Sequence, residues 1–326
     1  MTANAGGTQR QALVLGASGG IGGEVARQLR DAGWQVRALK RGLDAGTVER
    51  DGIAWIRGDA LDRETVVRAA RGCSVIVHAV NPPGYRNWSG QVLPMIDNTI
   101  AAATVAQATV VLPGTIYNYG PDAFPALREE TPQHPTTRKG AIRVELERRL
   151  QAATAQGVRT IIVRAGDFFG AHAGNNWFGQ GLVKAGRPVA AISVPGRPGV
   201  GHQWAYVPDV ARTMVELIER RDTLEPFARF HLGGHWDADG TQMAQAVRRV
   251  AQRHGMRPTV RRFPWWLVWA AAPFVTTMRE MIEMRYLWRE PLRMDNARVT
   301  AVLGREPVTP LDTAVEAALT ALGCLR

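Results

Sequence analysis

The sequence has few cysteines and no long apolar run, and each absence excludes a class of protein. Its 326 residues include only Cys73 and Cys324, which cannot build a disulfide framework or a four-thiolate zinc site. The seven histidines show no metal-ligand spacing, so we expect no metal site. No apolar run reaches the roughly 18 residues of a transmembrane helix, and the N-terminal residues do not resemble a secretory signal. We therefore expect a protein of the reducing cytoplasm.

Lysine is also rare. Of the 40 basic residues only Lys40, Lys139 and Lys184 are lysines, so 37 are arginines, and the net charge is +11. Such a balance favours anionic partners, namely phosphates, nucleic acid or a membrane surface, without choosing among them. Because 45% of the residues are apolar, the chain can bury a sizeable core, which excludes a disordered protein.

From residue 11 to residue 235, short apolar runs alternate with amphipathic helical stretches. The predicted strands are residues 12–15, 34–39, 53–56, 74–80, 110–112, 158–163 and 227–232, and the predicted helices are residues 22–30, 63–70, 92–108, 139–156 and 207–220. Asp62 is expected to cap the second helix, and Pro94 to lie in the first turn of the third. Strands that alternate with helices predict an α/β fold, a doubly wound parallel sheet of the Rossmann type.

The pattern changes after Gly170. Residues 171–204 are rich in glycine, proline, tryptophan and asparagine, which predicts a long irregular segment, and residues 236–326 predict a smaller, mostly helical lobe. We therefore expect residues 11–170 and 205–235 to form a dinucleotide-binding domain. Residues 171–204 and 236–326 would form a substrate-binding lobe.

The strongest motif is LVLGASGGIGG, residues 13–23, which follows the first strand and opens the first helix. Glycines in that context allow a tight turn and close backbone approach to a pyrophosphate at the helix N-terminus. A glycine-rich turn that merely packs is the alternative. The predicted contacts of this loop with a dinucleotide are Gly16, Ser18, Gly19, Gly20, Ile21 and Gly22.

The end of the second strand bears on the type of cofactor. Lys40 and Arg41 stand where an acidic residue would bind the ribose 2′-hydroxyl of NAD. Two cations suit a 2′-phosphate, so we predict NADP, with NAD as the other possibility; a solvated basic turn is the alternative. Asp59 is placed to face the adenine, or else it caps its own loop.

At this point the sequence resembles the extended short-chain dehydrogenase/reductases, the NAD-dependent epimerase/dehydratase group, over about residues 11–235. The matching motifs are GASGGIGG (16–23), GDALD (58–62), VIVHAV (75–80), GTIYNYG (114–120), VRAGDFFG (163–170) and YVPDVA (206–211). The resemblance implies further cofactor contacts at Ala60, Ala79, Val80 and Ala165. It also implies a homodimer that forms through the helices 92–108 and 139–156.

The catalytic pattern departs from the family. Extended members use a Ser or Thr and then Tyr-x-x-x-Lys on a helix, where the tyrosine exchanges the proton and the lysine holds the ribose. Thr115 fits the hydroxyl position, but the helix TTRKGAIRVELERRL contains no tyrosine. The best register puts Lys139 at the tyrosine position, Arg143 at the lysine position and Glu147 at a later glutamate. A shifted register would put Pro135 and Lys139 there.

The proton must then come from another group. Tyr117 lies two residues beyond Thr115, so in extended geometry both side chains would face the nicotinamide pocket. We predict that Tyr117 is the proton donor, that Lys139 or Arg143 supplies the nearby cation, and that Arg143 holds ribose hydroxyls. Lys139 is the alternative acid. In the other interpretation Lys139 and Arg143 lie on a solvated helix face, with Arg143 paired to Glu147.

The run PWWLVWAAAPF, residues 264–274, follows a stretch with six arginines between Arg248 and Arg262. We expect a core helix or an apolar wall of the substrate pocket. The alternative is an interfacial membrane anchor at Trp265–Trp269, with arginines on lipid phosphates. Nucleic-acid binding is not expected, because it would interleave aromatics with charge.

Together these features predict an enzyme, an NAD(P)-dependent oxidoreductase or epimerase/dehydratase. It would act by hydride transfer on a small substrate that carries a hydroxyl or carbonyl group. The competing class is an NADP-binding sensor or scaffold that lacks redox turnover.

Overall fold

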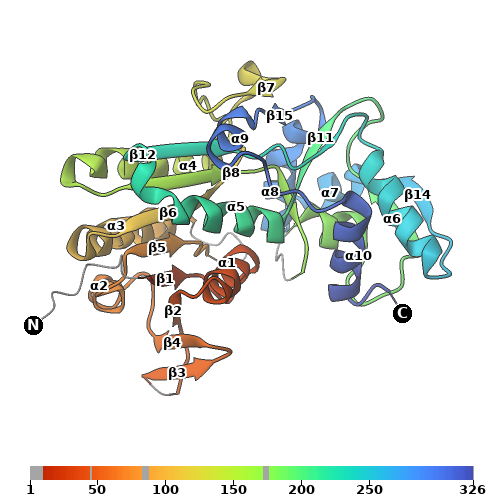
Figure 1. Ribbon diagram of the computed structural model, residues 1–326. Helices are drawn as coiled ribbons and strands as arrows, with labels where there is room; N and C mark the ends of the chain where they lie inside the picture. The colour runs from red at the N-terminus through yellow and green to blue at the C-terminus, as the bar shows by residue number, and fades with distance from the viewer. Residues whose placement is uncertain (1–9, 45, 83–87, 172–175, 326) are drawn as a thin grey trace, which may run out of the picture.

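The computed structural model describes residues 10–44, 46–82, 88–171 and 176–325. Its centre is an eight-stranded sheet in the order β12-β8-β6-β5-β1-β2-β4-β3 (Figure 1). The strands are β1 (Gln11–Leu15), β2 (Gln35–Lys40), β3 (Thr47–Arg50), β4 (Ile53–Arg57), β5 (Val75–His78), β6 (Thr109–Gly114), β8 (Thr160–Arg164) and β12 (Phe227–His231). All neighbours pair in parallel except β3 and β4, which are antiparallel. This is the doubly wound sheet that the sequence predicts.

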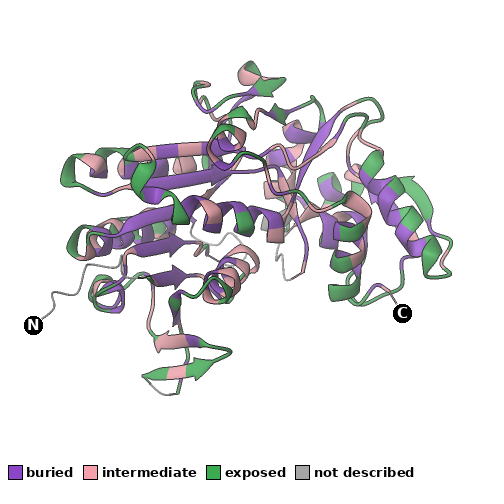
Figure 2. Ribbon diagram, in the orientation of Figure 1, coloured by how far each residue is buried: buried purple, intermediate pink, exposed green. Residues whose placement is uncertain are grey.

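Helices cover both faces of the sheet, because the central strands are apolar on both sides. Along β1, Ala12 and Val14 face one core while Leu13 and Leu15 face the other, and all four are at most 1% exposed. The sheet interior is accordingly buried in Figure 2. The first core is covered by α1 (Gly20–Asp31), α5 (Val207–Glu219) and α9 (Ala297–Leu303), and the second by α2 (Arg63–Ala70), α3 (Trp88–Ala106) and α4 (Arg138–Ala152).

The helix limits follow local signals in most cases. Asp62 caps α2 as predicted, since its Oδ1 accepts hydrogen bonds from the backbone N–H groups of Glu64 and Thr65. The position predicted for Pro94 is wrong, because α3 begins at Trp88 and Pro94 lies inside the helix. The Trp88 side chain is 6% exposed and packs in the second core, which extends the helix upstream of the apolar period.

β3 is an edge strand that the sequence analysis does not predict. It pairs only with β4 in the described sheet, and three of its four residues are exposed. It therefore lacks the apolar run by which the other strands were recognised.

The C-terminal lobe is smaller and mostly helical. Its helices are α6 (Gln242–Arg253), α7 (Trp265–Ala271), α8 (Thr276–Glu283) and α10 (Leu311–Ala321), around a third core that includes Phe178, Val247 and Leu319.

Short 3-10 helices span Pro121–Ala123, Ala153–Gln156, Arg221–Thr223 and Met284–Trp288. No helix of the described residues is long and apolar enough to cross a bilayer.

The segment 171–204 is more regular than predicted, although its residues 172–175 lie outside the described part. It holds a π-helical turn, Phe178–Leu182, and its strands belong to two of the three small sheets of the described residues. These sheets pair β11 (His202–Tyr206) with both β9 (Asp167–Phe169) and β13 (His235–Asp237), β10 (Ala191–Val194) with β14 (Thr259–Arg262), and β7 (Ala126–Leu127) with β15 (Arg293–Met294). The prediction fails because two of the strands find partners far away in the sequence.

Candidate active site

The glycine loop lies where the strand order of the sheet reverses, between β1 and β5. Gly16 follows β1 with φ +89°, and a Cβ on it would lie 2.5 Å from the Ala79 carbonyl oxygen and 2.7 Å from the Val80 nitrogen. Only glycine can make this approach. The structure thus brings together Gly16, Ala79 and Val80, and in open α/β sheets the crevice at such a reversal is the usual ligand site.

The first turn of α1 is pressed against the same loop. A Cβ on Gly22 would lie 2.3 Å from the Gly16 carbonyl oxygen, and the Gly19 N–H donates to that oxygen at 2.9 Å. Gly19 is the N-cap of α1 and has no side chain that could occupy the space before the helix. The backbone N–H groups that open the helix, at Gly20 and Ile21, are therefore arranged as in an anion-binding helix terminus, with Ser18 just before them.

Lys40 and Arg41 lie at the carboxyl end of β2, beside Asp59. The Lys40 Nζ is 5.5 Å from the centroid of the Trp55 ring. The Arg41 Nη1 is 3.8 Å from the Asp59 Oδ2, and 68% of the arginine side chain is exposed. Asp59 also accepts the Leu61 N–H, so it caps its own loop as the alternative interpretation held. A widely exposed guanidinium beside Asp59 can still contact an anion.

Two backbone positions of the predicted site are held firmly. The Ala60 carbonyl oxygen accepts a hydrogen bond from Asn98 Nδ2 of α3 at 3.0 Å. Ala165 follows β8 and is 2% exposed. Both lie just after strands of the parallel sheet, whose carboxyl ends meet at one edge.

Lys139 is buried, and it does not lie on a solvated helix face. Its side chain is 7% exposed, and its Nζ lies 2.6 Å from the Glu280 Oε2 of α8. In the same contact, Glu283 accepts a hydrogen bond from the Arg138 N–H. The C-terminal lobe therefore holds the first turn of α4 through two carboxylates.

The segment after β6 forms a turn, which corrects the extended geometry assumed for Thr115 and Tyr117. The Tyr119 N–H donates to the Ile116 carbonyl oxygen at 3.2 Å, and the Thr115 hydroxyl donates to Asn118 Oδ1 at 3.2 Å. Tyr117 packs on an apolar cluster that both lobes supply. The cluster comprises Ile116, Tyr119, Leu127, Met284, Leu287, Leu292 and Met294.

The turn also brings the backbone of Tyr117 against the start of α4. A Cβ on Gly140 would lie 2.2 Å from the Tyr117 carbonyl oxygen. The backbone of Tyr117 is therefore in contact with the first turn of α4, next to Lys139.

Arg143 lies one turn further along α4. Its Cζ is 5.2 Å from the centroid of the Trp88 ring. Burial, together with the positive charge of Arg143, lowers the pKa of His78 to about 3, so this imidazole is neutral at pH 7. His78 is the last residue of β5, directly before Ala79, and its Nδ1 lies 2.7 Å from the Thr99 hydroxyl. The charge of Arg143 therefore acts at the end of this strand.

Glu147 pairs with Arg164, contrary to the pairing with Arg143 in the alternative interpretation. Arg164 is fully buried, and its Nε lies 3.1 Å from the Glu147 Oε1. Its Nη1 donates to the Tyr119 hydroxyl at 3.0 Å, and burial raises the pKa of Tyr119 to about 12. This network ties α4, β8 and the Tyr117 turn together behind the site, with His231 of β12 at 3.0 Å from the Arg164 Nη1.

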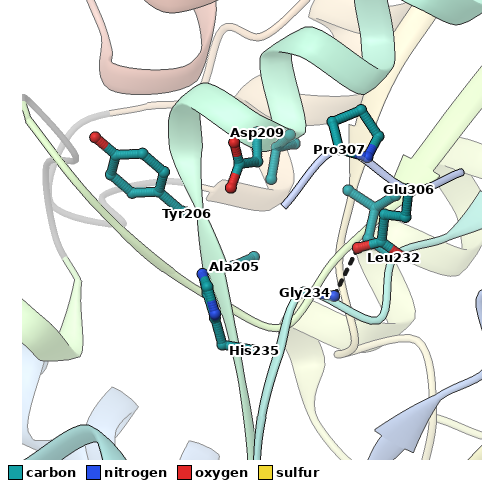
Figure 3. Close-up of a pocket in the computed structure, with 9 residues that line it drawn as sticks. Ala205, Tyr206, Asp209, Leu232, Gly234, His235, Glu306 and Pro307 are labelled. Atoms are coloured by element: carbon teal, nitrogen blue, oxygen red, sulfur yellow. Dashed lines mark hydrogen bonds between the residues drawn. The ribbon is translucent and has the colours of Figure 1, made fainter. Parts of the chain in front are cut away.

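A small cavity lies apart from these residues, around the start of α5 (Figure 3). Its carboxylates are already bound by protein groups. Asp209 accepts the Thr309 N–H and hydroxyl, each at 2.7 Å, and Glu306 accepts the N–H groups of Gly233 and Gly234. Burial lowers the pKa of His235, which also lines this cavity. None of the predicted site residues lines it, so we interpret it as structural.

The sequence alone does not identify Glu280 and His78 as residues of the candidate site. Glu280 and Glu283 are three residues apart on one helix, which places both on one face, but nothing in the sequence links them to α4. His78 stands within the recognised VIVHAV strand, and only the fold shows its neutral, buried state.

The model of the NAD-dependent epimerase/dehydratase family matches residues 12–233. Among curated proteins, a stretch of 179 residues is 28% identical to the uncharacterised protein y4nL of Sinorhizobium fredii and covers 48% of this chain and 50% of that protein. A stretch of 71 residues is 41% identical to (4-alkanoyl-5-oxo-2,5-dihydrofuran-3-yl)methyl phosphate reductase of Streptomyces griseus. It covers 22% of this chain and 25% of that protein. The chain thus matches half or less of the length of these relatives.

Solved structures share the fold along nearly the whole chain. The UDP-glucose 4-epimerase of Brucella ovis in complex with NAD is 19% identical, with a TM-score of 0.74 over 97% of this chain and 99% of that one. MoeE5 in complex with UDP-glucose and NAD is 21% identical, with a TM-score of 0.69 over 95% of this chain and 98% of that one. At these identities the likeness establishes the fold.

Proposed function

The chain belongs to the NAD-dependent epimerase/dehydratase family, a family of enzymes, and we propose that it is an NAD(P)-dependent oxidoreductase or epimerase/dehydratase. Its substrate would be a small molecule with a hydroxyl or carbonyl group. In this proposal residues 11–170 and 205–235 bind the dinucleotide. Residues 171–204 and 236–326 bind the substrate.

The glycine loop supports dinucleotide binding. A side chain at Gly16 or Gly22 would clash with the neighbouring backbone, and the N–H groups that open α1 lie directly beside this close-packed loop. Lys40 and the exposed Arg41 support NADP over NAD, since two cations suit the 2′-phosphate. Asp59, Ala60 and Ala165 would line the remainder of the cofactor site. When bound, the nicotinamide ring gives or takes the hydride.

The chain's own residues would orient the substrate and exchange its proton. Thr115 hydrogen-bonds the reacting oxygen, and the Tyr117 phenol exchanges the proton with it. In this proposal Lys139, whose Nζ is held by Glu280, supplies the positive charge that favours the Tyr117 phenolate. Arg143 holds ribose hydroxyls and does not act as a base, because a guanidinium does not give up its proton.

The observation that carries this proposal is the buried ion pair of Lys139 with Glu280 at the start of α4. It holds Lys139, which this proposal assigns to the family's tyrosine position, directly before Gly140, which lies against the Tyr117 backbone. The test is consumption of NADPH in the presence of a panel of aldehydes, ketones and keto sugars, with NADH in parallel. Turnover of at least one carbonyl, lost in Tyr117→Phe, is the expected result.

A dinucleotide-binding protein without turnover is the second candidate, because α4 carries no tyrosine at the family position. It predicts that the native protein binds NADPH but oxidises it with no member of the panel. Titration of NADPH binding in the same preparation separates this result from a misfolded sample.

A further inference from the structure

The C-terminal lobe presents an exposed apolar surface on α7 and the turn that follows it. We name this surface the α7 patch, and its residues are Trp266 (70% exposed), Leu267 (48%), Trp269 (51%), Phe274 (88%) and Val275 (41%). It corrects the expectation of a core helix for Trp266 and Trp269. Because soluble proteins rarely leave large apolar side chains exposed together, such a cluster indicates a binding surface.

The patch is held outward by the opposite face of the same helix. Trp265 donates its indole N–H to the Pro195 carbonyl oxygen at 2.8 Å, and its ring centroid lies 5.6 Å from that of Trp177. Val268 is 4% exposed, three residues further along. Since this face is anchored in the lobe, Trp266 and Leu267 are presented to the outside. Trp269, four residues after Trp265, lies at the edge of the anchored face and is 51% exposed.

Three arginines lie next to the helix that bears the patch. Arg261 and Arg262 are exposed at the end of β14, directly before the helix. The Arg285 Cζ lies 5.0 Å from the centroid of the Trp265 ring. Burial and the charges of Arg289 and Arg197 lower the pKa of Arg285, as expected where cations are gathered.

The acidic residues of α8 do not neutralise this charge, because they are used elsewhere. Glu280 pairs with Lys139, and Glu283 accepts the Arg138 N–H. An apolar surface with tryptophans and a cationic margin therefore remains.

We propose that the α7 patch, with Arg261 and Arg262 just before its helix, binds the surface of an anionic membrane. Tryptophan prefers the interface between lipid headgroups and acyl chains, and arginine can bury its aliphatic stem there while its guanidinium binds lipid phosphate. The attraction between basic residues and anionic lipid adds to the burial of the apolar side chains. This binding is peripheral, since no described helix could span a bilayer.

A second copy of the chain fits the surface less well. A two-fold interface would place the same patch, and hence the same arginines, on both sides of the contact. With a net charge of +11 in each chain, that arrangement concentrates like charge. An anionic lipid surface instead complements it.

The test is flotation of the purified protein with two kinds of vesicle. One kind contains phosphatidylcholine alone, and the other equal parts of phosphatidylcholine and phosphatidylglycerol. We expect binding to the anionic vesicles that weakens as salt rises. The variant Trp266→Ser/Phe274→Ser should reduce the partition coefficient at least ~10-fold, because it removes most of the buried apolar area.

Matched controls separate the patch from general surface chemistry. Val308→Ser removes an exposed apolar side chain (45% exposed) outside the patch and should leave binding unchanged. Arg261→Gln/Arg262→Gln should weaken anionic binding about 10-fold. Arg50→Gln/Arg63→Gln, which removes two exposed charges elsewhere, should have little effect beyond the loss of net charge. Unchanged thermal unfolding midpoints verify that the variants are folded.

Two results would overturn the proposal. The first is a native protein that floats with neither kind of vesicle. The second is self-association, measured by sedimentation, that Trp266→Ser/Phe274→Ser abolishes while vesicle binding is absent, which would make the patch an interface between copies. Neither result depends on the dinucleotide or on turnover, so the test is independent of the proposed activity.

Discussion

Lys139 of α4 and Glu280 of α8 form an ion pair in which 2.6 Å separates Nζ from Oε2. The lysine side chain is 7% exposed and the glutamate side chain 26%, so the ammonium group is shielded from solvent more completely than the carboxylate. The pair joins the helix at the candidate site to the C-terminal lobe. Its energetics are therefore asymmetric.

Glu280→Gln should destabilise the protein more than Lys139→Met does. The first leaves a buried ammonium without a counter-charge, whereas the second leaves a carboxylate that can still reach water. Removing one partner of a buried pair costs about 3–5 kcal/mol, so we expect roughly 3 kcal/mol for Glu280→Gln and less for Lys139→Met. Urea unfolding measures both. The double variant should cost less than the sum, and additive costs would show that the charges do not interact.

Tyr117→Phe should lower turnover by at least ~100-fold, the low end for the loss of a general acid, with cofactor affinity almost unchanged. Arg143→Ala should do the reverse and mainly weaken cofactor binding. Steady-state kinetics and NADPH titration separate the two effects. If Tyr117→Phe keeps full activity while Lys139→Met abolishes it, the lysine is the acid and this assignment fails.

NADPH should bind more tightly than NADH, because Lys40 and Arg41 end β2. Arg41→Ala should weaken NADPH binding by roughly 1.5–3 kcal/mol, the scale of a hydrogen bond to a charged group, and leave NADH nearly unchanged. Calorimetric titration at moderate salt measures both. Equal affinities of the native protein for the two dinucleotides would refute the prediction.

The stability of the fold should decrease as the pH is lowered below about 6.5. Burial, with the charges of Arg143 and Arg164 respectively, lowers the pKa of His78 and of His231 to about 3. A histidine of the unfolded chain titrates near 6.5, so below that pH the unfolded state binds more protons. Each histidine then removes about 1.4 kcal/mol per pH unit until its folded pKa is reached. His78→Gln should flatten the urea-unfolding profile against pH, and an unchanged profile in this variant would contradict the prediction.

We predict a homodimer that forms through α3 and α4. Val105 of α3 is 64% exposed, and Ala101, one helical turn before it on the same face, is half-buried and small, which would allow close approach of a second helix. Val105→Arg should convert the dimer to a monomer by placing a charge in that contact. Sedimentation at micromolar concentration measures the mass, and a native protein that is monomeric there contradicts the prediction.

The parallel sheet was predictable from sequence because its strands are local apolar runs that are buried on both faces, as in Ala12–Leu15. The glycine loop was predictable for a related reason. Backbone contacts require glycine at Gly16 and Gly22, and the regular spacing of these glycines is visible in the sequence. Signals of this kind lie within a few residues of each other.

The arrangement of the candidate site was predictable only in part. The Tyr117 turn replaces the extended geometry we assumed because local hydrogen bonds, from Tyr119 N–H and the Thr115 hydroxyl, set the backbone there. The partner of Lys139 comes from α8, and no local pattern identifies a charge so far along the chain. For the same reason the outward position of Trp266 was visible only in the structure.

The short strand β3 determines how this sheet ends. A parallel sheet that stopped at β4 would offer that strand's backbone N–H and C=O groups to any other extended chain. β3 covers them with four mostly exposed residues, and Glu49 and Arg50 place both signs of charge on the outer margin. Charged, short edge strands discourage further pairing, so this end of the molecule is protected from growth into aggregates.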